Sequence, residues 1–406
     1  MAREICPGTK QRACWLKKLV LSAVMVGAGV ASAQTGPYVQ TNLVSNISGL
    51  ASITDPLLVN PWGIARGATS PFWVSNQGTN SSTLYAITGS TDVTRVEIAP
   101  NGFVAIPTTA AGPQGPTGQV NNANTASFQL TPGNAVTSSR FIFANLNGTI
   151  SGWAGGPSAS VRATTPGAVY TGLGINAAGT RLYAADTVSG GVHAFDSSFA
   201  RLSLPGAFVD PNLPTGFGAF NVQDISGTVY VTYAPAGLEA QRNATRGMGF
   251  VSAFDENGSF LRRVVSGSRL AAPWGLAVAP VDFGPFAGDL LVGNFSFGAS
   301  EINAFDQATG VLAGTIPINV GAGNTPGGLW GLAFGNGGNG GSPGTLYFAN
   351  GINGETAGLF AALTPVPEPS SVALTSLGLL LLFGWRKSQS ARRRYEEGDG
   401  RPVHEA

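Results

Sequence analysis

The sequence predicts an all-β domain built from repeats of about fifty residues, and two recurring patterns support this prediction. The first is a Trp-Gly pattern, found at Pro61-Trp62-Gly63-Ile64-Ala65, Pro273-Trp274-Gly275-Leu276-Ala277 and Leu329-Trp330-Gly331-Leu332-Ala333. The second ends in Phe-Asp and occupies residues 192–196, 251–255 and 302–306. Its phenylalanines lie 59 and 51 positions apart, and the last two tryptophans of the first pattern lie 56 apart. Such spacings between short apolar strands are typical of β-propeller blades.

The best preserved repeat indicates how a blade is built. Its four strands are expected at residues 275–280, 289–296, 301–306 and 311–318, from the central axis outwards. Glycine makes up 58 of 406 residues while 43% are hydrophobic, a balance that indicates tight turns between buried strands and not a disordered chain. The same plan fits the chain six times, with inner strands starting near Trp62, Asn134, Gly172, Phe220, Trp274 and Trp330. The second repeat fits least well.

The last repeat supplies only three strands, near residues 331, 344–350 and 358–363. An alternating segment at residues 38–46, close to the N-terminus, is the expected fourth. Such a strand would join the two ends of the chain and leave no open sheet edge. The predicted fold is therefore a six-bladed β-propeller closed by an N-terminal strand.

The N-terminal residues 1–33 resemble a signal peptide. Lys17 and Lys18 precede an apolar stretch at residues 19–30, and Ala31 and Ala33 are small residues of the kind that a signal peptidase accepts. Cleavage is expected before Gln34. Both cysteines, Cys6 and Cys14, precede this site, so the exported part would contain no thiol, disulfide or thiolate metal site.

The C-terminal residues 365–406 have three parts in a fixed order. Pro367, Glu368 and Pro369 come first, an apolar run follows at residues 372–385, and Arg386 and Lys387 close it. The alternative is an ordinary single-pass anchor, but the run is shorter than the 20 or so residues that a full span takes. The order resembles the PEP-CTERM sorting signal of Gram-negative bacteria. The resemblance implies an exosortase-type processing enzyme as partner and transient anchoring in the inner membrane through residues 372–385.

Charge is sparse in the domain expected between residues 34 and 364. It has eleven arginines, fifteen acidic residues and no lysine, a net charge of −4. Nucleic acids and anionic lipids bind clustered cations, so neither is an expected partner.

The domain is poor in catalytic residue types. Its one histidine, His193, occupies the position of Ser252 and Asn303 in the repeated pattern, which suggests a polar side chain facing outwards. No nucleophile elbow, HExxH motif or metal-ligand spacing occurs. We therefore assign no catalytic residue and expect no cofactor, with calcium as the one alternative.

Two sets of residues are candidates for binding. Asp210, Asn212, Asn221 and Asp224 carry hard oxygen ligands that suit calcium, although Asp-Pro at residue 210 is also a common turn starter. Trp62, Trp274 and Trp330 would lie near each other in adjoining blades, where aromatic faces suit a sugar ring or an apolar side chain. Tryptophans in this pattern can equally be packing residues.

The exported part resembles a family of exported bacterial propellers related in pattern to NHL-repeat propellers. The resemblance rests on residues 41–46, 60–65, 208–214, 219–223, 272–280, 290–298 and 328–335. It implies the propeller fold and export. Ala357 stands where the family commonly has histidine. The expected function is a non-catalytic binding or structural module linked to exopolysaccharide or biofilm surfaces, and the alternative is a lactonase-like extracellular hydrolase or lyase.

Overall fold

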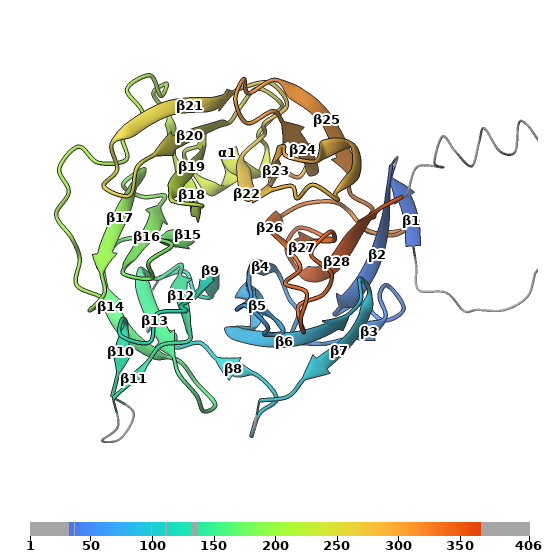
Figure 1. The fold of residues 1–406 in the computed structure, drawn as a ribbon, viewed down its shortest axis with the longest axis horizontal. Helices are drawn as coiled ribbons and strands as arrows, with labels where there is room; N and C mark the ends of the chain where they lie inside the picture. The colour runs from blue at the N-terminus through green and yellow to red at the C-terminus, as the bar shows by residue number, and fades with distance from the viewer. Residues whose placement is uncertain (1–31, 36, 99, 110–111, 132–135, 367–406) are drawn as a thin grey trace, which may run out of the picture.

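The computed structural model describes residues 32–35, 37–98, 100–109, 112–131 and 136–366. They form six sheets arranged radially around a central axis, together with one small two-stranded sheet, as Figure 1 shows. The described residues contain 28 strands but one α-helix, α1 (Leu238–Arg242), and two 3-10 turns, η1 (Gln77–Thr79) and η2 (Gly284–Phe286). The predicted all-β, six-bladed propeller is confirmed.

Each blade begins with an inner strand on the axis and continues outwards. The inner strands of blades 1 to 6 are β4 (Pro61–Ala65), β9 (Pro116–Asn121), β15 (Tyr170–Ile175), β18 (Phe217–Ile225), β22 (Pro273–Val278) and β26 (Leu329–Phe334). The second strands are β5 (Phe72–Asn76), β12 (Phe141–Asn145), β16 (Arg181–Asp186), β19 (Thr228–Pro235), β23 (Leu290–Asn294) and β27 (Leu346–Ile352). The third strands are β6 (Ser81–Thr88), β13 (Thr149–Trp153), β17 (Gly191–Asp196), β20 (Phe250–Phe254), β24 (Glu301–Phe305) and β28 (Ala357–Pro365).

Five blades have an outer strand. These strands are β7 (Asp92–Val96), β14 (Ser160–Thr164), β21 (Phe260–Ser266), β25 (Leu312–Pro317) and, for blade 6, β2 (Tyr38–Ser45). Blade 3 has three strands, and the chain after β17 forms only an isolated bridge between Phe195 and Arg201. The remaining short strands are β1 (Ser32–Thr35), β3 (Ile53–Thr54), β8 (Val104–Ala105), β10 (Gln129–Leu130) and β11 (Thr137–Ser138).

The N-terminal strand closes the ring as predicted. In blade 6, β2 pairs antiparallel with β28, from Tyr38 opposite Pro365 to Ser45 opposite Leu359. Tyr38 is fully buried, stacks on Phe283 of blade 5 at 4.7 Å between ring centroids and donates a hydrogen bond to its carbonyl oxygen. The closing strand thus also joins blade 6 to blade 5.

The position predicted for the inner strand of blade 2 is wrong. That strand is β9, which starts at Pro116, 18 residues before the predicted start at Asn134, which lies outside the described residues. The small hairpin β10–β11 is inserted between β9 and its partner β12, so the inner strand of blade 2 lies further from the second strand in the sequence than the repeat predicts. The sequence of β9, PTGQVN, also has few apolar residues, so it carried little strand signal.

Glycine follows tryptophan in the repeated pattern because neighbouring inner strands approach closely at the axis. A Cβ placed on Gly63 would lie 2.5 Å from the carbonyl oxygen of Thr117 in blade 2. A Cβ on Gly331 would lie 2.9 Å from the carbonyl oxygen of Trp62 in blade 1. No larger residue fits without a backbone shift. Glycine therefore follows tryptophan in the repeat because neighbouring blades pack closely at this position.

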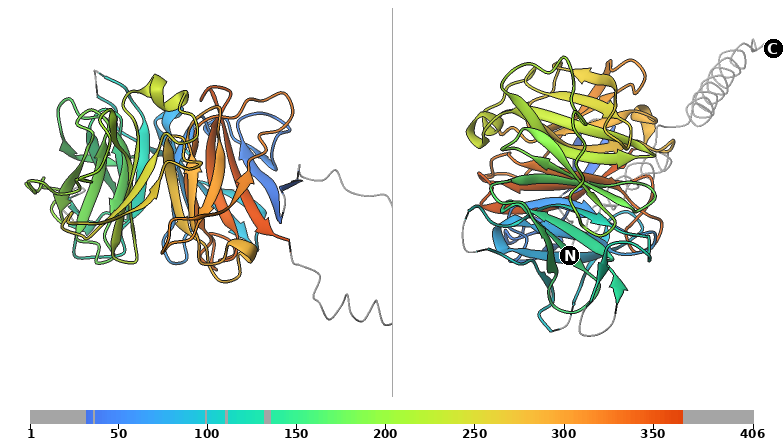
Figure 2. Two further views of the ribbon diagram at one scale, coloured as in Figure 1. Left: turned by 90° about the horizontal axis from the view of Figure 1, so that it is seen from above. Right: turned by 90° about the vertical axis from the view of Figure 1, so that its left-hand side faces the viewer.

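The ring has two faces, which we name by the direction of the inner strands. The inner strands begin at the upper face and end at the lower face. Helix α1 follows a second strand and lies on the upper face, whereas η2 follows an inner strand and lies on the lower face, as the left view of Figure 2 shows.

Removing β2 is expected to open the ring. The strand buries Tyr38, Leu43 and Val44 completely, and each such side chain is worth about 1.5–3 kcal/mol. A fragment starting at Asn46 should therefore lose at least about 5 kcal/mol of unfolding free energy, or about 10 °C in Tm, relative to one starting at Gly36. Both fragments lack β1, so the comparison isolates β2. Equal Tm values by calorimetry would contradict the closure.

Candidate functional site

Three tryptophans meet on the central axis and fill it. Trp62, Trp274 and Trp330 each hold the second position of an inner strand, in blades 1, 5 and 6. Trp62 and Trp330 stack with ring centroids 3.5 Å apart, and Trp274 stands edge-on to them at 6.3 and 5.6 Å. Phe220 and Phe295 complete this aromatic plug, in which Trp330 is fully buried. The three predicted tryptophans therefore lie together, and their main role is to fill the channel by packing against one another.

The three indole N–H groups of the plug differ in their hydrogen-bond partners. Trp330 donates its Nε1–H to Asn60 Oδ1 (3.1 Å) and Trp274 donates to the carbonyl oxygen of Thr171 (2.9 Å). The Nε1 of Trp62 has no hydrogen-bond partner among the described residues, although it is buried. Trp62 lines a cavity above the plug and Trp274 lines one below it. The plug therefore divides the channel into two separate cavities.

The upper cavity is the larger, with a volume of about 580 Å³. Loops that join second to third strands surround it, together with the starts of inner strands. Its apolar wall is formed by Trp62, Pro113, Leu146, Val169, Val188 and Leu238. Its polar groups are Asn60, Gln77, Thr171, Thr187, Gln241, Arg242 and Glu355. An apolar wall with a few placed polar groups is the usual composition of a small-molecule site.

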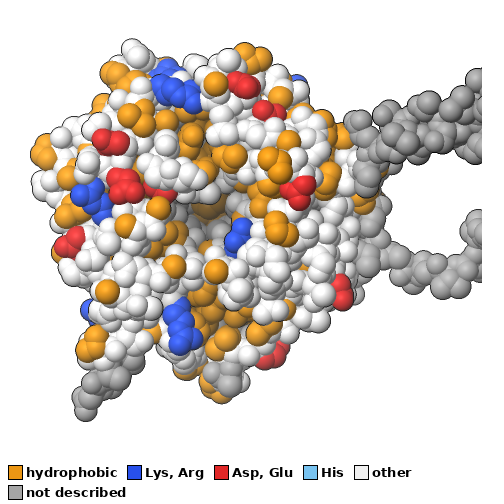
Figure 3. Space-filling model, in the orientation of Figure 1, with side chains coloured by type: hydrophobic (Ala, Val, Ile, Leu, Met, Phe, Trp, Pro, Cys, Tyr) orange, Lys and Arg blue, Asp and Glu red, His pale blue; other side chains and the backbone are white. Residues whose placement is uncertain are grey.

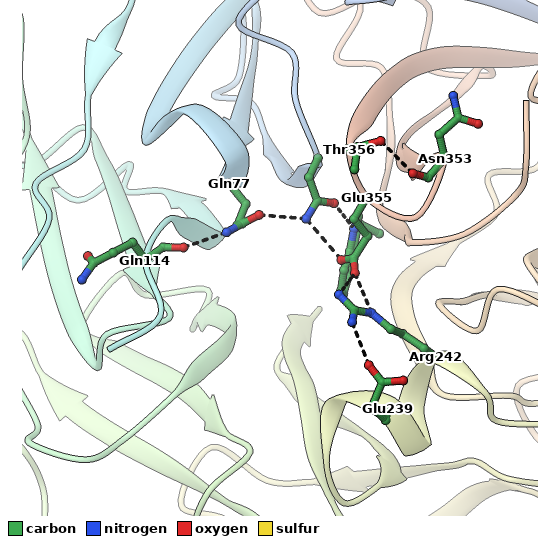
Figure 4. Close-up of polar contacts among 9 residues, drawn as sticks. Gln77, Gln114, Glu239, Arg242, Asn353, Glu355 and Thr356 are labelled. Atoms are coloured by element: carbon green, nitrogen blue, oxygen red, sulfur yellow. Dashed lines mark hydrogen bonds and ion pairs between the residues drawn. The ribbon is translucent and has the colours of Figure 1, made fainter. Parts of the chain in front are cut away.

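A polar network ties four blades together at the rim of this cavity (Figure 4). Glu355 Oε2 accepts from Arg242 Nε and Nη2, at 2.9 and 2.6 Å. Asn60 Nδ2 donates to Glu355 Oε1 (3.2 Å) and to Gln77 Oε1 (2.9 Å), and Gln77 Nε2 donates to the carbonyl oxygen of Gln114. Burial disfavours the charged form of Arg242. The hydrogen bonds and the negative charge of Glu355 together outweigh this effect and raise the pKa of Arg242.

The backbone of this network is strained. Asn60 has φ of 46° and Glu355 has φ of 70°, values in the left-handed region that residues other than glycine rarely adopt. Such strain costs about 1–3 kcal/mol per residue and persists only where surrounding contacts hold it. No sequence pattern singled out Glu355 or Arg242, because the contact joins loops 113 residues apart.

The lower cavity has a volume of about 430 Å³ and opens at the centre of the face seen in Figure 3. Three predicted residues line it, namely Trp274, Asn221 and Asp224. Asn221 donates its Nδ2–H to the carbonyl oxygen of Trp274 (2.8 Å), and Asp224 accepts from the Gly227 amide. The Oδ2 of Asp224 has no partner within the described chain. Burial and the nearby charge of Glu256 raise the pKa of Asp224, against the hydrogen bond from Gly227.

The residues of the alternative calcium group do not come together. Asp210 lies away from this cavity, where its Oδ2 accepts from Ser252 Oγ (2.6 Å) and from Arg263 Nε (2.8 Å). Its Oδ1 accepts from the amide of Asn212, so Asp210 starts a turn, and its Oδ2 forms an ion pair with Arg263 of the outer strand β21. In the described ranges no three His, Cys, Asp or Glu side chains gather as a metal-binding group.

His193 occupies the predicted repeat position, but it does not face outwards. His193, Ser252 and Asn303 pair across the sheet with Ala184, Val231 and Val292, which are equivalent positions in three blades. The side chain of His193 is only 11% exposed. Its Nδ1 lies 3.0 Å from the Tyr170 hydroxyl and its Nε2 lies 3.6 Å from Asp186 Oδ2. The side chain of His193 is therefore a mostly buried polar contact within blade 3, and it also lines a third cavity of about 430 Å³.

Most residues predicted for processing lie outside the described residues, namely Ala31, Pro367, Glu368, Pro369, Arg386 and Lys387. Ala33 lies in β1, opposite Gln40 of β2. The predicted cleavage site before Gln34 therefore falls within β1. Among the residues that the structure covers, no helix is long and apolar enough to cross a membrane.

Comparison with a protein-family model identifies the C-terminal segment. Residues 365–388 match the PEP-CTERM protein-sorting motif. Two solved structures resemble the chain in fold, a gluconolactonase from Xanthomonas campestris and a streptogramin B lyase. The first has 16% identity, a TM-score of 0.41 and coverage of 62% of this chain and 86% of its own. The second has 11% identity, a TM-score of 0.46 and coverage of 81% and 98%.

Relatives with higher identity come from Acanthamoeba polyphaga mimivirus. "Uncharacterized protein R648" is 32% identical over 277 residues, which cover 65% of this chain and 66% of the relative. "Uncharacterized protein L690" is 31% identical over 277 residues, which cover 65% of this chain and 70% of the relative. The matched segment thus spans about two thirds of each viral protein. The chain belongs to the family of these mimivirus proteins, and it is an exported six-bladed β-propeller with a PEP-CTERM protein-sorting motif at its C-terminus.

Proposed function

We propose that the propeller is a non-catalytic module of the cell envelope or extracellular matrix that binds a neutral carbohydrate in its upper cavity. The observation that carries this proposal is the composition of that cavity, an apolar wall beside a rim of side-chain amides. Sugars present both apolar C–H faces and many hydroxyl groups. A site that combines tryptophan with amide donors and acceptors matches both features.

The charges at the rim support a neutral ligand. Arg242 and Glu355 neutralise each other in the network, so the cavity has no uncompensated cation for an anionic ligand. The unpartnered Nε1–H of Trp62 is a donor that a ligand hydroxyl could satisfy, which would relieve the cost of leaving it buried and unpaired. The volume of about 580 Å³ lies within the range of known small-molecule sites.

The same residues argue against catalysis in the upper cavity. Glu355 is the one carboxylate among its lining residues, and Arg242 and Asn60 already occupy both of its oxygens. Glycoside hydrolysis usually takes two carboxylates on opposite sides of the bond. The lining contains no histidine or cysteine to act as base or nucleophile.

Arg242→Ala should weaken carbohydrate binding at least tenfold. The substitution removes a rim donor and leaves Glu355 buried without its cation. Arg246→Ala is the matched control, because Arg246 pairs with Glu301 and does not line the cavity. A glycan array followed by titration calorimetry on residues 32–366 should show binding by the parent and Arg246→Ala, and at least a tenfold loss for Arg242→Ala. No binding by the parent domain to any glycan would contradict the proposal.

The sorting motif predicts processing at the bacterial envelope. Prolines on both sides of Glu368 keep the backbone extended and unable to enter a helix. Replacing Pro367, Glu368 and Pro369 with alanine should leave the chain unprocessed in the inner membrane of a host that has an exosortase-type enzyme. Mass spectrometry of the mature form tests this outcome. Normal processing of the variant would contradict sorting through this motif.

The second candidate is an extracellular hydrolase or lyase that acts at the lower cavity. Asp224 favours it, since a carboxyl group with a raised pKa and an unpartnered oxygen suits a general acid. Screening the domain with lactones, phosphoesters and uronic-acid polysaccharides, with and without calcium, distinguishes the candidates. Turnover that is lost in Asp224→Asn would show that the domain is an enzyme and not a binding module.

If the module is non-catalytic, Asp224→Asn should only change stability. Because its folded pKa is raised, Asp224 binds a proton more readily in the folded state, so its ionisation costs stability as pH rises from about 4 through the folded pKa. The Asn variant should therefore have a higher Tm than the parent at pH 7, with a difference that shrinks towards pH 4. Asp306→Asn, at an exposed turn, is a control that should not share this behaviour because the pKa of Asp306 is lowered. A lower Tm for Asp224→Asn at pH 7 would contradict the assignment.

A further inference from the structure

We infer that the attached propeller presents its lower face to the membrane and its upper cavity to the surroundings. The inference rests on the proposed attachment through the C-terminal sorting segment. It adds an orientation, which the motif alone does not contain.

The first observation is where the described chain ends. Strand β28 is a third strand, so it runs from the upper to the lower face and ends at Pro365. The amide of Val366 still donates to the carbonyl oxygen of Pro37 (2.8 Å), which holds the chain against the domain to its last described residue. Gly284 of η2, on the lower face, lies next to Pro365. The left view of Figure 2 shows this exit at the rim of the ring, on the side of η2.

The N-terminal segment lies on the same side of the ring. Tyr38, the first residue of β2, pairs directly with Pro365. Strand β1 turns back along β2 and places Ser32 opposite Thr41, so the leader and the segment that follows β28 join the domain on the same side of the ring. Either of the two membrane-directed segments would pull the same part of the ring towards the membrane.

The second observation is the length of the connection. Only five residues, 367–371, separate Val366 from the apolar run that starts at Val372. Six steps along a fully extended chain reach about 20 Å at most. The nine residues of β28 span about 30 Å between the two faces. The connection is too short to pass the thickness of the ring, so the upper face cannot lie against the membrane.

This arrangement gives the two cavities different access. The upper cavity with its Arg242–Glu355 rim stays open to soluble or matrix carbohydrate. The lower cavity, with Asp224, opens on the face nearer to the bilayer.

Energy transfer from single labelled cysteines to a headgroup acceptor in vesicles tests the orientation. The background is the full chain with Cys6→Ser and Cys14→Ser, which removes every native cysteine. Val281→Cys places the donor on the lower face, where Val281 is 94% exposed between β22 and β23. Thr245→Cys places it at an exposed position after α1, on the upper face.

We expect about twofold higher transfer from residue 281 than from residue 245, because about 30 Å of sheet separates the two faces. The control is a thirty-residue Gly/Ser insertion after Val366 in a chain whose leader has been removed. Its reach of about 30 Å should make the two signals similar. Equal or reversed transfer without the insertion would overturn the orientation alone. A chain that stays in solution and does not enter the vesicles would overturn the attachment, and with it this inference.

Discussion

The pairing of β2 with β28 is the interaction on which the rest of the structure depends. A propeller blade buries its faces only against its two neighbours, so an open ring would leave blades 1 and 6 with exposed apolar surfaces. Here one strand from near the N-terminus completes the sheet that the C-terminal strands begin, over seven paired positions from Tyr38 to Ser45. The same strand stacks on blade 5 through Tyr38, so closure and packing between blades are one event. Both ends of the chain consequently leave the domain together.

Crowding at the axis explains the most visible sequence pattern and also the shape of the site. Inner strands of adjoining blades approach so closely that only glycine fits at Gly63 and Gly331. The tryptophan before each glycine then points into space that no backbone occupies, and three of them fill the channel. The plug leaves one cavity on each face instead of a through-channel. A ligand site in this propeller is therefore a property of one face.

The two cavities differ in their chemistry. In the upper one, the charged pair Arg242–Glu355 and the amides of Asn60 and Gln77 satisfy one another, and two residues with left-handed backbone are held in place. Such a preorganised rim suits recognition, because little order is lost when a ligand binds. In the lower one, Asp224 keeps an oxygen without a partner and a raised pKa, the condition associated with reactive acids. The proposed binding function and its enzymatic alternative thus belong to different faces.

The sequence by itself determined the repeat architecture, because spacing and period-two alternation are local properties of the chain. The blade count, the closing strand and the sorting motif at residues 365–388 all followed from such patterns. Local patterns also predicted that the three tryptophans would meet. They failed at β9, where the β10–β11 hairpin interrupts the repeat, and at His193, whose burial depends on Tyr170 and Asp186 from other strands. The tertiary structure alone decided that Asp210 belongs to an ion pair with Arg263, that Asp224 lines a cavity, and that Glu355 meets Arg242. The Glu355–Arg242 contact joins loops of different blades, and no spacing within a single blade encodes a partner that only the closed ring brings into contact.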